Sequence, residues 1–118
     1  MKLLMLASLV SSLGLAGNWS GALVDADCYA REERNVTLKA EEVNHDRDFE
    51  INQCAPNAKT KSFTVVERNG LSFNLDPQGN AKAAGLIPAA PRKGRIYVDV
   101  TGEKSGDTVK VSSISAAR

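Results

Sequence analysis

The stretch SFTVVERNGLSFNL, residues 62–75, gives the clearest structural signal in this 118-residue chain. Its first six residues are rich in β-branched and aromatic side chains, which favour strands. Asn69-Gly70 follows and is a strong hairpin signal, because a type I′ turn needs positive φ at both central residues. The remaining residues alternate and place Leu71, Phe73 and Leu75 on one face. The stretch therefore predicts a two-stranded hairpin.

Three further strands are expected around this hairpin. The first covers residues 19–24, where Gly21 marks a bulge or a close backbone approach. Residues 95–102 alternate like the hairpin, and residues 108–114 form the last strand after a turn at Gly106-Asp107. We expect the inward side chains to form one core: Phe63, Val65, Leu71, Phe73, Leu75, Ile96, Val98, Val100, Val109 and Val111.

The other segments supply a turn, a short helix and a long loop. Residues 76–80 have the composition of a turn, and residues 81–84 favour a short helix that stops at Gly85. Residues 27–57 show no strand pattern and are expected to form a long loop, with one helical turn around residues 40–43. The resulting β-β-β-α-β-β order predicts a mainly β, five-stranded OB-like barrel, with a split sandwich as the alternative.

The N-terminal residues predict export. Lys2 is followed by an uncharged run over residues 3–15, and Gly14-Leu15-Ala16 has the small-x-small pattern of a signal peptidase site. This run is too short to span a bilayer core of roughly 30 Å as a helix. Residues 1–16 are therefore predicted to be a signal peptide, which leaves residues 17–118 as one periplasmic or extracellular domain without a transmembrane segment.

Cys28 and Cys54 are the two cysteines of the chain, and an even count in an exported protein predicts a disulfide. Closing a loop of about 27 residues contributes roughly 3.5 kcal/mol through the entropy of the unfolded chain. The bond would tether the long loop to the barrel. Metal ligation that includes His45, the lone histidine, is the alternative, although the cysteine spacing lacks the tight pairs of a zinc site.

Charge excludes some partners. Removing Lys2 from the 15 Lys and Arg leaves 14, which the 14 Asp and Glu balance, and the two signs are interspersed. Nucleic-acid binders instead carry a clustered basic face. The outward hairpin residues are expected to be polar rather than aromatic, which disfavours a base-stacking platform: Thr64, Arg68, Ser72 and Asn74. We expect a monomer whose partner is a ligand or an envelope protein.

The segment WSGALVDADC, residues 19–28, resembles the start of small exported bacterial proteins of unknown function, which share a Trp-x-Gly-x-hydrophobic-x-Asp-x-x-Cys motif. The ending is similar as well: a hydrophobic strand with Thr101-Gly102, a polar turn, and a strand that closes on Ser113-Ile114. More distantly, this ending resembles the last two strands of periplasmic bacterial OB-fold proteins. The resemblance implies an exported barrel and transfers no catalytic residue.

Two sets of residues are candidates for function. Trp19, Tyr29 and Tyr97 could line a ligand groove, although a lone tryptophan more often fills a core. Asp25 and Asp27, two apart on a strand, could join His45 in a small metal-dependent hydrolase. Because no nucleophile motif accompanies them, the favoured function is a non-enzymatic binding or structural envelope module. No catalytic residue, metal or cofactor is assigned.

Overall fold

The computed structural model describes residues 15–34, 43–87 and 95–117. Within these ranges the elements follow in the order β1 (Leu15–Asp25), α2 (Ala26–Arg34), α3 (Val43–Gln53), β2 (Phe63–Glu67), β3 (Ser72–Leu75), α4 (Pro77–Ala84), β4 (Tyr97–Ser105) and β5 (Thr108–Ala116). The predicted signal peptide lies outside the described residues except for its last two, which begin β1.

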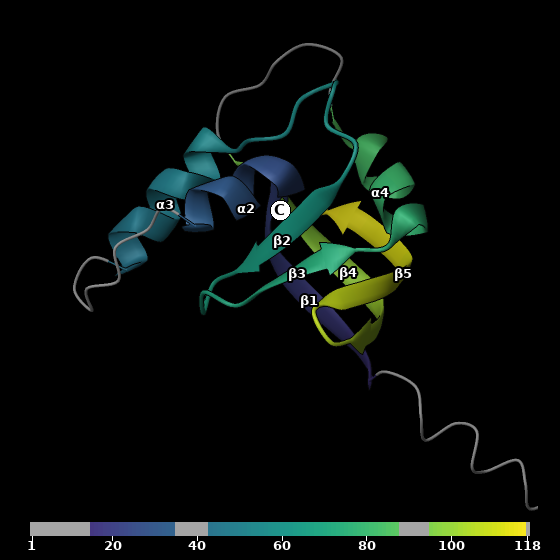
Figure 1. Cartoon of the computed structure of the whole chain (residues 1–118). Helices are drawn as coiled ribbons and strands as arrows, with labels where there is room; N and C mark the ends of the chain where they lie inside the picture. The colour runs from purple at the N-terminus through teal and green to yellow at the C-terminus, as the bar shows by residue number, and fades with distance from the viewer. Residues whose placement is uncertain (1–14, 35–42, 88–94, 118) are drawn as a thin grey trace, which may run out of the picture.

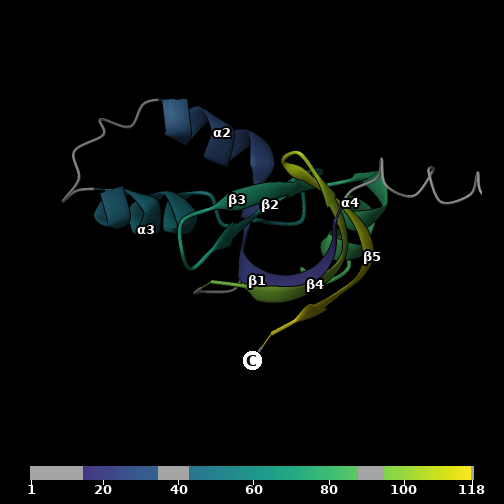
Figure 2. The ribbon, with the colours of Figure 1, turned by 90° about the horizontal axis from the view of Figure 1, so that it is seen from below.

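The strands form a closed barrel in the order β1-β2-β3-β5-β4 (Figures 1 and 2). Every neighbouring pair is antiparallel except β3 and β5, which run parallel over a short register. This is the five-stranded OB-like barrel that the element order predicted. Helix α4 lies between β3 and β4 in the chain and packs against β5 (Figure 1).

Strand β1 bends sharply and so belongs to both halves of the barrel (Figure 2). Its first part, residues 15–22, pairs with β4, and its last part, residues 21–25, pairs with β2. Gly21 belongs to both registers, and a Cβ atom there would collide with the carbonyl group of Val66. The predicted close backbone approach at Gly21 is confirmed, since only glycine lets the two strands come this near at the bend.

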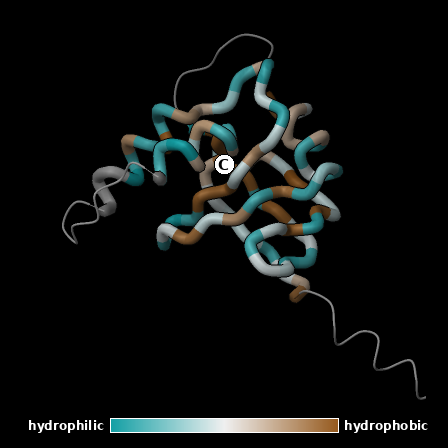
Figure 3. Tube along the Cα trace, viewed as in Figure 1, coloured by the Kyte–Doolittle hydropathy of each residue, from teal (hydrophilic) through white to brown (hydrophobic). Residues whose placement is uncertain are grey.

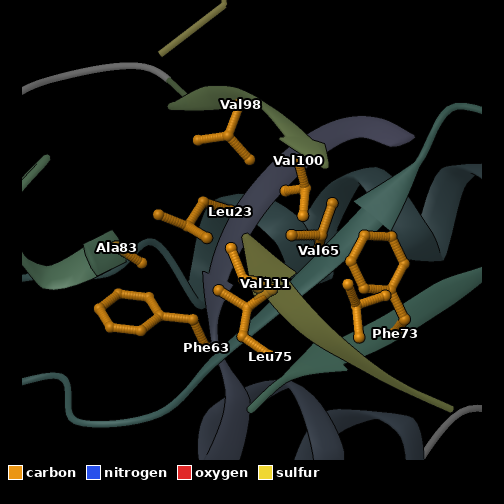
Figure 4. Close-up of a cluster of buried hydrophobic side chains, with 10 residues drawn as sticks. Leu23, Phe63, Val65, Phe73, Leu75, Ala83, Val98, Val100 and Val111 are labelled. Atoms are coloured by element: carbon orange, nitrogen blue, oxygen red, sulfur yellow. The ribbon is translucent and has the colours of Figure 1, made fainter. Parts of the chain in front are cut away.

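Inward side chains fill the barrel and point toward one another (Figure 4). Eight of the ten predicted core residues are buried in this cluster, and Ile96 packs against it while partly buried. Leu23 and Ala83 of α4 complete the core. The prediction for Leu71 is wrong, because its side chain is 60% exposed.

The turn of the hairpin explains the exposure of Leu71. The Glu67 N–H donates to the Leu71 carbonyl at 2.8 Å, and the Gly70 N–H donates to the Glu67 carbonyl at 2.9 Å. Three residues therefore connect the strands, with Gly70 at φ 92°, as in hairpins whose last loop residue is left-handed. The hairpin is confirmed, but the two-residue type I′ turn is not. The longer loop leaves Leu71 before the start of β3.

The predicted long loop over residues 27–57 is wrong in its main feature. Helices α2 and α3 occupy most of it and lie beside the barrel next to β2 (Figure 1), while residues 40–42 of the predicted helical turn lie outside the described residues. These helices are largely hydrophilic, whereas apolar residues concentrate in the strands (Figure 3). A second buried cluster joins the helices to the outer face of the sheet: Ala22, Val24, Tyr29, Ile51, Cys54 and Val66.

Packing of α2 against β2 also changes the environment of Thr64. Its side chain was expected on an open outer face, but the residue is buried, and its hydroxyl donates to Asn74 Oδ1 at 2.7 Å. Both faces of β2 are therefore covered, which explains why Phe63, Thr64, Val65 and Val66 are all buried instead of alternating.

Helix α4 begins earlier than predicted. The Asp76 side chain accepts a hydrogen bond from the Gly79 N–H at 2.9 Å, and Pro77 occupies the first helical turn. Both are typical helix-start features, so residues 76–80 start the helix instead of forming a separate turn. Gly85 ends the helix as expected, although its φ of −69° is right-handed. No helix in the described ranges is long and apolar enough to cross a membrane.

Candidate functional site

The three predicted ligand aromatics lie in three different environments. Trp19 packs against the barrel core, with its ring centroid 5.8 Å from that of Phe73. Lys104 covers this end of the barrel, and its Nζ lies 5.8 Å from the Trp19 ring centroid. Trp19 and Leu23 point inward, whereas Ala22 belongs to the second cluster on the outside of the sheet. Trp19 therefore contributes to the core, as expected for a lone tryptophan.

Tyr29 is buried in the second cluster, between α2 and the barrel. Burial raises the pKa of its hydroxyl above the ordinary value, and the neighbouring carboxylates Glu33 and Glu50 raise it further. Its ring supports the helices and is 6% exposed, which leaves little surface for a ligand. Tyr97 is the remaining candidate, with 43% of its surface exposed on the outer face of β4.

The Cys28–Cys54 disulfide is present, with an S–S distance of 2.04 Å and Cα atoms 5.5 Å apart. It joins α2 to the residue that follows α3. The backbone continues this link, since the Asp25 N–H donates to the Cys54 carbonyl at 2.8 Å. The predicted disulfide tethers a pair of helices, and the described part of the chain holds no free cysteine.

Asp25 has a structural role at the start of α2. Its Oδ1 accepts from the Cys28 N–H at 3.0 Å, and its Oδ2 accepts from the Thr60 hydroxyl at 2.9 Å. The first bond is the N-cap geometry that stabilises a helix. The second fixes the segment between α3 and β2. Both carboxylate oxygens therefore have partners within the fold.

Within the described residues, Asp27 and His45 do not join Asp25 in a metal or catalytic site. Asp27 lies exposed in the first turn of α2, so the two aspartates do not alternate along a strand as predicted. His45 belongs to α3, and its side chain lies outside the described residues. Among the side chains that are described, no group of three His, Cys, Asp or Glu residues could hold a metal ion.

A groove of about 760 Å³ lies between α3 and the outer face of the sheet. Residues of β1, the end of β2, β4 and α3 line it. Ala22, Ile51 and Val66 of the second cluster lie at its base and are almost fully buried, so the exposed ring of Tyr97 supplies apolar surface to the groove. Tyr97 lies opposite Ala22 in the β1–β4 register and is the one predicted aromatic that lines the groove.

Arg95 fixes the α3 side of the groove. Its Nε donates to Asn52 Oδ1 at 3.1 Å, and its Nη2 lies 3.4 Å from Asp48 Oδ1. Nη1 donates to the Tyr97 hydroxyl at 3.4 Å. Burial lowers the pKa of Arg95, but the hydrogen bond to Tyr97 and the charge of Asp48 outweigh it and raise the pKa. The guanidinium is thus a charged link between β4 and α3.

The other charged residues of the groove have fewer partners. The Asp99 Oδ1 accepts from the Ser20 hydroxyl, its neighbour in the β1–β4 register. Arg47 on α3 reaches the hairpin, where its guanidinium lies against Gly70. Arg68 and Glu67 line the same end of the groove.

Sequence reasoning identified Tyr97 but missed the rest of this groove. The alternation along β4 indicated that Tyr97 and Asp99 face outward, since they alternate with the buried Val98 and Val100. The α3 wall could not be inferred, because residues 43–53 were assigned to a loop. Arg47 and Asp48 of α3 line the groove, which the loop prediction did not anticipate.

Comparison with protein-family models, with curated proteins and with solved structures finds no match to this chain. The resemblance of residues 19–28 to small exported bacterial proteins stays a prediction.

Proposed function

We propose that this protein is an exported, non-enzymatic binding module whose ligand site is the groove between α3 and the outer face of the barrel. The groove carries the proposal. Its volume of about 760 Å³ lies within the range of about 300–1,000 Å³ that is common for small-molecule sites. An exposed aromatic ring, that of Tyr97, with charged groups around it is also typical of such sites.

Export to a bacterial periplasm or to the medium is supported by the N-terminal sequence and by the disulfide, which persists in oxidising compartments. Cleavage after Ala16 would remove the first two residues of β1 and leave Gly17 paired with Gly102. N-terminal sequencing of protein recovered from the periplasm or the medium should give Gly17 as the first residue. An uncleaved chain retained in the cytoplasm would contradict export.

A ligand screen by NMR tests the binding role. We expect compounds from a small-molecule fragment library to shift amide resonances of Ala22, Val66 and Tyr97. The variant Ser20→Phe should abolish these shifts, because Ser20 is exposed and lines the groove. Ser113→Phe is the matched control, an exposed strand serine that does not line the groove. Equal binding to both variants, or no binding to the groove, would contradict the proposal.

A further inference from the structure

The charges of the groove suggest what kind of ligand it holds. Three cations line it, Arg47, Arg68 and Arg95, together with three anions, Asp48, Glu67 and Asp99. Arg95 and Asp48 are already paired with each other, as described above. The four remaining residues are two arginines and two carboxylates. A ligand with one sign of charge would therefore meet repulsion as well as attraction.

These four residues are not mixed at random along the groove. Arg47 and Arg68 lie at the hairpin end, where the Arg47 guanidinium contacts Gly70 and Arg68 directly follows the last residue of β2. Glu67 is at this end too, so cations outnumber anions there by two to one. Asp99 lies on β4, on the other side of β1 from β2. Within the described residues, no hydrogen bond engages its Oδ2 atom.

We propose that the groove binds short peptides with free termini. The C-terminal carboxylate lies toward Arg47 and Arg68, and the N-terminal ammonium lies toward Asp99. The peptide's side chains lie against the exposed ring of Tyr97. This inference names the ligand class of the same groove and so rests on the proposed binding function.

Dimensions fit this assignment. Neighbouring strands lie about 4.8 Å apart, so the backbones of β2 and β4, on either side of β1, are separated by roughly 10 Å. An extended chain advances about 3.3–3.6 Å per residue, so a dipeptide or tripeptide spans roughly 7–10 Å. Arginine donates to a carboxylate in a planar, two-pronged geometry, and a second carboxylate oxygen on Asp99 can accept from an ammonium group.

Calorimetric titration with leucyl-leucine tests the proposal. N-acetyl-leucyl-leucine lacks the ammonium and leucyl-leucinamide lacks the carboxylate, so each should bind at least about tenfold more weakly, as expected for one lost charged hydrogen bond. Equal affinity for all three compounds would overturn the proposal, because the termini would then contribute nothing.

Two variants assign the two ends of the peptide. Arg68→Gln should lower the affinity for leucyl-leucine until it is close to the affinity for leucyl-leucinamide. The variant should still bind N-acetyl-leucyl-leucine more weakly than leucyl-leucine. Asp99→Asn should do the reverse. Arg31→Gln and Asp107→Asn make the same charge changes at exposed positions that do not line the groove, and they should bind like the unmodified protein. A loss of affinity in the controls equal to that in the groove variants would contradict the assignment.

The fragment screen separates failure of this inference from failure of the binding function. If fragments shift groove resonances but leucyl-leucine does not bind, the peptide assignment is overturned and the binding function stands. If neither binds, both are overturned.

Discussion

The barrel interior and the α2–α3 region are held together by different interactions. Large aliphatic and aromatic side chains fill the barrel, and those buried in its core are each at most 5% exposed. The second cluster is smaller and includes a disulfide cysteine and the partly polar Tyr29. Covalent and hydrogen-bonded links supplement it: the disulfide, the Asp25 side chain, and the bond from the Ala26 N–H to the Ser62 carbonyl. Apolar burial dominates the first region, and specific links matter more in the second.

Truncating the barrel core should have the largest effect on stability. Phe73→Ala removes a ring that is 1% exposed and contacts Trp19, so we expect a loss of about 3–5 kcal/mol in the free energy of unfolding. Leu71→Ala, at an exposed position of the same hairpin, should change it by less than about 0.5 kcal/mol. Urea unfolding measures both. Similar losses in the two variants would mean that the register differs from that observed.

Reducing the disulfide should have the next largest effect and should act on the other region. We expect a loss of about 2–4 kcal/mol, because the unfolded chain regains the entropy of a closed loop. Hydrogen exchange should rise first in α2 and α3, while the amides of Val98 and Val100 stay protected. Thiol titration of the unreduced protein should find no free thiol. Two reactive thiols would contradict the bond and favour the metal site with His45.

The two N-caps provide a finer comparison of the regions. Asp25→Ala removes partners from Cys28 and Thr60, and Asp76→Ala removes partners from Gly79 and from the Val111 N–H, which lies 3.1 Å from Asp76 Oδ1. Each variant should lose about 1–2 kcal/mol in the free energy of unfolding. Hydrogen exchange should rise around α2 in the first variant and around α4 and β5 in the second.

A chelator provides the control for Asp25. If its role is structural, EDTA should leave the melting temperature of the unmodified protein unchanged. A marked drop on chelation would support a metal site at Asp25 instead.

Replacing Tyr29 should have the smallest effect on the free energy of unfolding at neutral pH. Because its pKa is raised in the folded state, its neutral form contributes stability that is complete below about pH 10 and is lost as the pH rises further. Tyr29→Phe keeps the ring and should cost less than about 1 kcal/mol at pH 7, while it reduces the alkaline loss of stability. Thermal unfolding from pH 7 to 11 measures this, with Tyr97→Phe as the control. Unchanged alkaline sensitivity in Tyr29→Phe would contradict the role of the buried hydroxyl.

The sequence by itself determined the barrel. The alternation of apolar and polar residues placed Phe73, Leu75, Val98 and Val100 inside. In a strand with one buried face, every second side chain points to the core. The disulfide followed from a count of two cysteines in a chain whose N-terminal residues predict export. The Leu71 error has a local cause, since a hairpin loop of three residues instead of two shifts where the paired strand begins.

Only the tertiary structure decided α3 and the groove. Residues 43–53 are rich in charge, and Phe49 is 57% exposed while Ile51 is buried, so the apolar pattern of α3 is weak. Residues 26–34 do separate polar from apolar side chains with a helical period, a signal that the loop prediction missed. The helical form of both segments is supported by contacts distant in sequence: the bond to Cys54, the Asp25–Thr60 link and the outer face of β2. The groove depends on the same packing, because one of its walls is α3. Such contacts leave no periodic pattern in the sequence, since each joins residues whose spacing is set by the fold and not by a local repeat.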